Sequence, residues 1–338
     1  MTNQPITQPP TRSQRFNDRL FQGLCRGFAW LVVLLVSFIV VRIAVAALPA
    51  MRQYGFGFLS GTTWDPNQSR FGILPEIWGT LLTSLLALVL GTLFGVAAAV
   101  FLSEAYLGQF VFGALKRMDL HLHPFLSKLP DQMENLLKNL IELLAAIPSV
   151  VYGLWGLFVV IPLIRPGSNW LHLKMGWMPL FGTDLSGPGV LPAALVLSIM
   201  ILPTITAISR DALVSVPPKL RMAAYGLGAT RWETILAVIL PTASRGIFGG
   251  VVLAFGRALG ETMALAMLVG NANKISVSLF SPANTLAALL ANSFPEAPPK
   301  EVAVLMYAAL VLLGITLVVN MAGSLILQRA SAGMQGGK

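Results

Sequence analysis

Two ionisable residues, Arg257 and Glu261, stand inside an apolar segment in the second half of the sequence. The segment from Phe248 to Gly270 otherwise contains only apolar, glycine and threonine residues. An ionised side chain at the centre of a bilayer costs about 2.5 to 3.5 kcal/mol on insertion scales, so such residues usually face a protein interior or a water-filled path. Because the two are four residues apart, we expect them to share one face of a helix. They predict either the lining of a pathway for a charged substrate or an ion pair that fixes this helix against its neighbours.

The composition indicates an integral membrane protein. Of the 338 residues, 55% are hydrophobic and 11% are charged, whereas soluble domains carry about 25% charged residues. The formal net charge is +9, but the basic residues lie in short segments between apolar spans, which is typical of membrane topology and argues against nucleic-acid binding. The single cysteine, Cys25, excludes an intramolecular disulfide.

The elements that must position the charged pair are six apolar spans, at residues 28–48, 77–102, 140–164, 190–208, 246–270 and 301–327. We expect an all-α fold with a polar cytoplasmic tail at 1–27, a first membrane helix at 28–48 and a core of five membrane helices at 75–327. Fifteen Lys and Arg residues lie in the two terminal segments and the loops after the second and fourth spans, against six in the other three loops. The positive-inside rule therefore places both termini in the cytoplasm.

The third span contains residues that interrupt helices. Pro148 lacks a backbone donor, and Gly153 and Gly156 follow within about two turns. A membrane helix tolerates such a break when its neighbours satisfy the freed carbonyl groups. We therefore expect this span to be bent or broken. Ser149 and Tyr152, beside the break, face either the pathway or a neighbouring helix.

The polar segment 209–245 predicts a cytoplasmic elbow of two short helices between the fourth and fifth spans. Pro217 suits the start of the first helix, and Gly228 supplies a turn. Thr230 and Glu233 have the spacing of a capping box, which predicts the start of the second helix. Such an elbow is either a lever for a soluble partner or an interfacial helix without one.

Motifs of common enzyme sites are missing from the sequence. It has no G-x-x-x-x-G-K-[ST], H-E-x-x-H or G-x-S-x-G motif, so it cannot form the phosphate-binding loop of an ATPase and shows no metalloprotease or serine-hydrolase signature. The glycine pair Gly226 and Gly228 follows no strand and predicts a helix break rather than a nucleotide-binding loop. We therefore expect a protein that is not an enzyme and binds no cofactor itself.

The elbow resembles the cytoplasmic signature of ABC importer permeases. In that family the pattern is E-A-A, then glycine, then I-x-L-P, and this sequence matches it at five positions, namely Ala223, Ala224, Gly228, Leu240 and Pro241. Val238 replaces the isoleucine, and Met222 replaces the glutamate. The methionine removes a charge from the surface that the resemblance assigns to coupling.

Two further stretches resemble the phosphate-specific, PstC-type branch of this family. They are LAAIPSVVYGLWG (residues 144–156) and GRALGETMA (residues 256–264), the second being followed by Gly270-Asn271. The similarity covers most of residues 75–325. It does not extend to the tail 1–27 or to residues 108–139, a loop that is longer than usual in the family.

The resemblance implies a type I ABC importer permease fold in a bacterial inner membrane and a function in importing inorganic phosphate. A second related permease, a dimeric cytoplasmic ATPase that binds ATP and magnesium, and a periplasmic phosphate-binding protein are the implied partners. The implied residues of the substrate pathway are Arg257, Glu261, Thr262, Asn271, Ser149 and Tyr152. The implied ATPase-coupling residues are Met222, Ala223, Ala224, Gly228, Leu240 and Pro241.

Three alternatives remain at this point. A permease for another oxyanion, such as molybdate or sulfate, would share the elbow but not necessarily GRALGETMA. A stand-alone secondary transporter or channel would show inverted repeats with paired broken helices, which the sequence does not display. A membrane scaffold protein would not need charged residues within a span.

Overall fold

The computed structural model describes residues 12–104 and 129–335. Within these ranges the chain is mostly helical, with one antiparallel hairpin of two short strands. The helices are α1 (Arg12–Tyr54), α2 (Gly57–Ser60), α3 (Leu74–Ser103), α5 (Leu129–Ala146), α6 (Ser149–Trp155), α7 (Ile161–Met175), α8 (Val190–Val214), α9 (Pro218–Gly226), α10 (Arg231–Thr234), α11 (Leu240–Leu259), α12 (Met263–Leu268), α13 (Leu286–Ser293) and α14 (Pro299–Gln335). The strands are β1 (Trp64–Asp65) and β2 (Arg70–Phe71), and two π-helical turns, η2 (Gly156–Val160) and η4 (Ile235–Ile239), join neighbouring helices.

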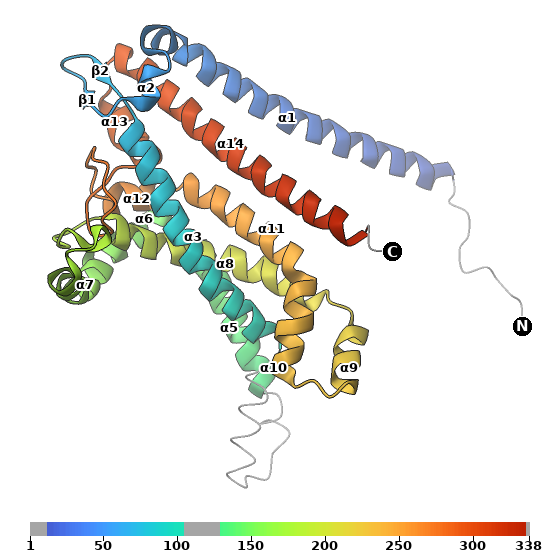
Figure 1. Cartoon of the computed structure of the whole chain (residues 1–338). Helices are drawn as coiled ribbons and strands as arrows, with labels where there is room; N and C mark the ends of the chain where they lie inside the picture. Colours follow the sequence, from blue (N-terminus) through green and yellow to red (C-terminus); the bar gives the residue numbers. More distant parts are fainter. Residues whose placement is uncertain (1–11, 105–128, 336–338) are drawn as a thin grey trace, which may run out of the picture.

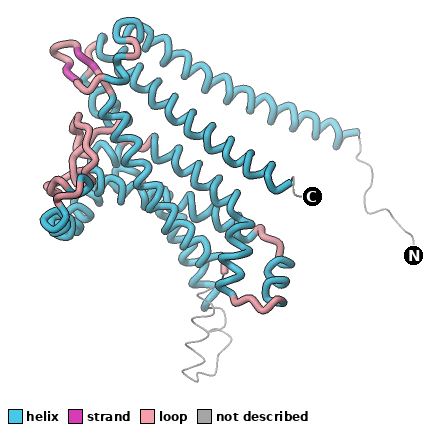
Figure 2. Tube along the Cα trace, viewed as in Figure 1, coloured by secondary structure: helices cyan, strands magenta, loops and turns pink. Residues whose placement is uncertain are grey.

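Among the described residues, six helical segments are long and apolar enough to cross a membrane, which confirms the predicted all-α architecture with six spans. They are Arg12–Tyr54, Leu74–Ser103, Ser149–Met175, Val190–Val214, Arg231–Leu259 and Pro299–Arg329. In Figure 1, α1 lies beside α14, and α9 and α10 lie at the end of the molecule opposite the hairpin. Most loops also lie near the two ends of the bundle (Figure 2).

The centre of the bundle is the packing of α3 against α8. Gly91 and Gly95 of α3 lie so close to α8 that a Cβ atom on them would come within 2.9 Å of Ile201 and 2.8 Å of Ile205. Both isoleucines are fully buried, and the Thr206 hydroxyl donates to the Gly95 carbonyl at 3.2 Å. Small residues allow this close approach between membrane helices. The two helices therefore form a tightly packed pair on which α11 also rests.

The first membrane helix begins earlier than the predicted boundary at residue 28. α1 is continuous from Arg12, so the described part of the polar tail is helical. Phe16, Leu20 and Leu24 repeat at a spacing of four and extend an apolar stripe back from the span. The boundary between tail and membrane helix is therefore a change in composition within one helix.

The third span is broken at the predicted place but lies further along the chain than residues 140–164. α5 ends at Ala146, and α6 begins at Ser149, directly after Pro148. From there the helix continues through η2 to Met175, across a segment that we expected to be an outer loop. Contacts with the next loop hold this extension, because Asn169 accepts the Leu185 N–H at 2.8 Å.

The fifth span also differs from the prediction of one helix over residues 246–270. It starts near the capping box and ends at Leu259. α12 follows after a short non-helical stretch, and the chain then reverses at Gly270, whose φ of +98° suits glycine. The polar loop expected after it contains a further helix, α13, with four buried residues.

Candidate functional site

Arg257, Glu261 and Thr262 lie at the break between α11 and α12. Because α11 ends at Leu259, Arg257 and Glu261 are not on one continuous helix, and the prediction that they share one helix face is wrong. Gly260, a poor helix former, occupies the position after the last helical residue. The Thr262 hydroxyl donates to the Gly260 carbonyl at 3.0 Å, which satisfies a backbone acceptor that the break would leave free.

The two charged side chains have different partners. Nη1 of Arg257 donates to Oγ1 of Thr204 on α8 at 3.5 Å. Oε1 of Glu261 accepts the N–H of Ala264, in the first turn of α12, also at 3.5 Å. Among the ion pairs between described residues, none joins Arg257 to Glu261. The Glu261 carboxylate therefore binds the first turn of α12. The Arg257 guanidinium binds Thr204, a residue that the sequence alone did not indicate.

Tyr152 and Ser149 both lie on α6, which packs against α12. Gly153 of this helix lies against α12, where an ideal Cβ atom would be 2.7 Å from Sδ of Met267 and 3.3 Å from Cα of Ala264. Tyr152 is buried, and its hydroxyl donates to the Leu144 carbonyl at 2.7 Å, across the break at Pro148. The hydrogen bond between Arg257 and Thr204 therefore joins two spans, and Tyr152 lies on a third span that packs against α12.

Asn271 is held at the far end of α12 by local hydrogen bonds. Its Nδ2 donates to the Ala266 carbonyl at 3.0 Å, and its Oδ1 accepts from Nδ2 of Asn292 at 3.0 Å. Its φ of +51° lies in the left-handed region, which asparagine tolerates better than most residues. Asn271 thus fixes the chain reversal after α12, and its described contacts do not include Arg257.

The Arg257 guanidinium is a group of the kind that binds anions. The side chain is exposed in this chain although its helix is a membrane span. A guanidinium has five N–H donors in a planar fork that matches the oxygens of carboxylate or phosphate. The hydrogen bond to Thr204 is at the long limit, so it can be exchanged at little cost for a charge-assisted bond to a ligand.

The elbow between α8 and α11 has the predicted geometry. α9 starts after Pro217, and Gly228 follows it with a φ of +84°, which a residue with a side chain rarely adopts. Thr230 and Glu233 form both hydrogen bonds of a capping box at the start of α10. Figure 1 shows α9 projecting from the rest of the molecule. This local chemistry fixes the angle between α9 and α10.

Apart from Gly228 in the turn, the implied coupling residues lie on α9 and at the start of α11. Met222 and Ala223 are exposed on α9, whereas Ala224 faces the protein. Met222 is 72% exposed, so the methionine that replaces the family glutamate lies on the outer surface. Leu240 and Pro241 begin α11, where Leu240 packs on a buried cluster that includes Leu213 and Ile239. Leu240 and Pro241 therefore lie where the elbow joins α11.

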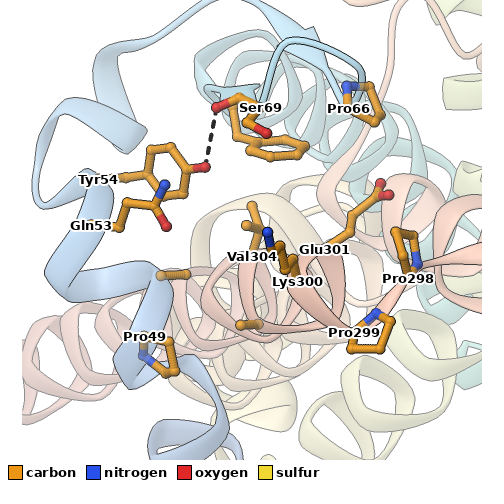
Figure 3. A pocket seen from close by; sticks show the side chains of 13 residues that line it. Pro49, Gln53, Tyr54, Pro66, Ser69, Pro298, Pro299, Lys300, Glu301 and Val304 are labelled. Atoms are coloured by element: carbon orange, nitrogen blue, oxygen red, sulfur yellow. Dashed lines mark hydrogen bonds between the residues drawn. The ribbon is translucent and has the colours of Figure 1, made fainter.

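A separate cavity of about 770 Å³ lies at the hairpin end of the molecule (Figure 3). It is bounded by the end of α1, the β1–β2 loop and the start of α14, with Tyr54 and Glu301 among its lining residues. The Tyr54 hydroxyl donates to the Ser69 carbonyl at 3.1 Å. None of the predicted pathway or coupling residues lines this cavity.

The six membrane-length helices of the described residues are typical of a membrane permease. Comparison with known families identifies the family of permeases. Residues 125–330 match the model of the binding-protein-dependent transport system inner membrane component. The chain belongs to this family. With six membrane-length helices, it is a multi-pass inner-membrane protein.

Individual relatives are more specific. The chain is 37% identical to a phosphate transport system permease protein PstC of Mesorhizobium japonicum, over 92% of this chain and 91% of the relative. It is also 37% identical to a protein of the same name from Pasteurella multocida, over 92% of both chains. A probable PstC of Methanocaldococcus jannaschii is 32% identical over 84% of this chain and 85% of the relative.

Solved structures support the fold. A chain of a bacterial alginate ABC transporter, in complex with a periplasmic protein bound to an alginate pentasaccharide, aligns with a TM-score of 0.56 over 92% of this chain and 98% of that chain, at 17% identity. A chain of the MetNI methionine ABC transporter aligns with a TM-score of 0.52 over 79% of this chain and 99% of that chain, at 16% identity. These likenesses establish the ABC importer permease fold.

Proposed function

We propose that this chain is the permease subunit of an ATP-driven importer that moves inorganic phosphate into the cytoplasm. The observation that carries this proposal is the position of Arg257. Its guanidinium is exposed at a break within a membrane span, in a chain that is 37% identical to phosphate permeases over 92% of its length. A charged group and an interrupted backbone are tolerated at membrane depth where they line a polar path.

In this proposal Arg257 contacts phosphate oxygens, and Thr204 holds the guanidinium between passages. Glu261 and Thr262 stand at the same break. The Glu261 carboxylate weakens the binding of highly charged anions by repulsion, which limits trapping of the substrate. Ser149 is the first residue of α6, and Asn271 positions the segment after α12.

A partner ATPase supplies the energy in this proposal, because the sequence has no phosphate-binding loop of its own. The elbow offers an apolar docking surface. Its exposed large side chains are Leu220, Met222, Tyr225, Leu227 and Trp232. Exposed apolar patches on projecting elements are typical of protein interaction sites. The lysine and arginine distribution places this elbow, and both termini, on the cytoplasmic side.

The remaining partners follow from the family description, which names a binding-protein-dependent system. We propose a second, related permease that completes the pathway beside Arg257, and a periplasmic phosphate-binding protein that delivers the substrate at the hairpin end. Many large apolar side chains on α1, α3 and α14 are exposed in the single chain, so lipid and the second permease have ample apolar surface to cover.

The test is phosphate uptake into proteoliposomes that contain this chain, the second permease, the ATPase and the binding protein. Uptake that requires ATP and every component is the expected result. Each component is omitted in turn as a control, and molybdate and sulfate are tested as competitors. Uptake by this chain alone along an ion gradient would overturn the proposal, and preferential uptake of molybdate or sulfate would change the substrate.

A further inference from the structure

A buried carboxylate lies at the end of α3, directly beneath the elbow. Glu104 follows the last residue of α3, and its side chain is only 5% exposed. Its Oε1 accepts a hydrogen bond from Nη1 of Arg221 on α9 at 2.6 Å. Such short charge-assisted bonds are roughly twice as strong as neutral ones. The carboxylate therefore ties the projecting helix to the end of a membrane span.

A second arginine completes this ion cluster. Nη2 of Arg231, the first residue of α10, lies 3.9 Å from Oε2 of Glu104 and donates to the Glu104 carbonyl. Arg221 also donates, through Nη2, to the Leu213 carbonyl near the end of α8 at 3.2 Å. The two arginines come from both helices of the elbow, and their acceptors lie on α8 and at the end of α3. The elbow is thus joined to two spans by charged groups.

We propose that the Glu104 ion cluster, formed by Glu104, Arg221 and Arg231, is the joint through which movement of the elbow is transmitted to α3 and α8. Glu104 is a positioning residue in this proposal, which rests on the proposed function. The partner ATPase contacts exposed groups such as Met222. Arg221, the preceding residue, points inward and is bound to Glu104. Displacement of α9 therefore pulls directly on a span.

The N-terminal end of α3 contacts residues 283–286, and these residues contact the end of α12. Oγ1 of Thr80 accepts the Leu286 N–H at 2.9 Å. Gly79 lies against the Asn284 carbonyl, so closely that a Cβ atom there would be 1.9 Å from the oxygen. The Ala283 N–H donates to the Val269 carbonyl just after α12, at 2.9 Å. Described contacts therefore run from Glu104 through α3 to the helix that begins beside Glu261.

The physical requirement for such a joint is that it resists separation. An exposed ion pair contributes little, because water and salt compete with it. The Glu104 carboxylate is almost fully covered, so removal of its charge leaves two arginines with a neutral partner in a buried place. We expect this change to loosen the elbow from α3 while leaving the exposed docking surface unaltered.

The experiment measures phosphate imported per ATP hydrolysed in proteoliposomes with all four components. For Glu104→Gln, which keeps the side-chain shape, we expect this ratio to fall about tenfold while the ATPase rate stays within about twofold of wild type. The matched control is Glu142→Gln, which removes an exposed carboxylate paired with Lys138 at 3.7 Å on α5. We expect the control to keep the wild-type ratio.

A second variant guards against a failure of Glu104→Gln to assemble. Arg221→Gln removes the partner that is 23% exposed, and we expect the same fall in the ratio. An assembled variant of either kind that keeps the wild-type ratio would overturn the inference. A parallel loss of uptake and ATPase activity would also overturn it, since that pattern indicates a structural role. Failure of the wild-type system to import phosphate would instead refute the proposed function.

Discussion

Gly79 offers a sharp test of how α3 holds the segment that follows α12. An ideal Cβ atom on this glycine would lie 1.9 Å from the Asn284 carbonyl oxygen, whereas real Cβ atoms essentially never come closer than 3.0 Å to another heavy atom. The clashing atom belongs to the backbone, so no side-chain rotation relieves the overlap. Gly79→Ala therefore forces α3 and residues 283–286 apart by about 1 Å.

This displacement has a cost that can be worked from the structure. Overpacking of a tight contact typically costs about 1 to 3 kcal/mol. The neighbouring bond from the Leu286 N–H to Oγ1 of Thr80 is 2.9 Å long, and its loss adds about 1 kcal/mol. We expect Gly79→Ala to destabilise the folded chain by about 2 to 4 kcal/mol in total.

The assay is thermal unfolding of the purified chain in detergent, with Gly314→Ala as the matched control. Gly314 lies within α14 and has no heavy atom within 4 Å of its ideal Cβ position. Alanine at a compatible glycine position stabilises by about 0.4 to 1 kcal/mol, so the control should melt at or above the wild-type temperature. Equal melting temperatures for Gly79→Ala and wild type would refute the close contact between α3 and Asn284.

Three further predictions concern the pathway and the elbow. Arg257→Lys keeps the charge but loses the planar fork, so the KM for phosphate in the reconstituted system should rise about tenfold; an unchanged KM would contradict direct contact between Arg257 and phosphate. Thr204→Val keeps the shape but removes the acceptor of the Arg257 hydrogen bond, so uptake should fall severalfold with normal assembly, and wild-type uptake would show that Thr204 does not position the guanidinium. Thr230→Ala removes the hydroxyl that accepts the Glu233 N–H in the capping box and should lower the free energy of unfolding by about 1 kcal/mol. The readouts are the melting temperature and the phosphate-dependent ATPase activity. No change in either would mean that the cap does not set the geometry of the elbow.

The six spans and the elbow could be predicted because their signals are local. A span needs only a sufficient run of apolar residues. In the elbow, Gly228 supplies a backbone conformation that other residues avoid, and Thr230 with Glu233 carries its own hydrogen-bond partners within four residues. The break at Pro148 is local in the same sense, since proline itself removes the donor.

The contacts that assemble the site could not be predicted in this way. Thr204 is 53 residues from Arg257, and Glu104 is 117 residues from Arg221. A single sequence shows only that Thr204 interrupts an apolar span and that Glu104 ends one. Their partners depend on the packing of α3, α8 and α11, which the hydrophobic pattern alone does not specify.

The end of α11 shows why the error about Arg257 and Glu261 matters for function. A spacing of four predicts a shared helix face, and that view favours an ion pair in which each charge neutralises the other. The structure instead ends the helix between them, so Glu261 binds the backbone of α12 and Arg257 binds an uncharged hydroxyl. An arginine that forms no ion pair with a carboxylate attracts an anion more strongly. In the described part of the chain the helix break thus leaves Arg257 and Glu261 with separate partners, which supports the pathway interpretation over a structural ion pair.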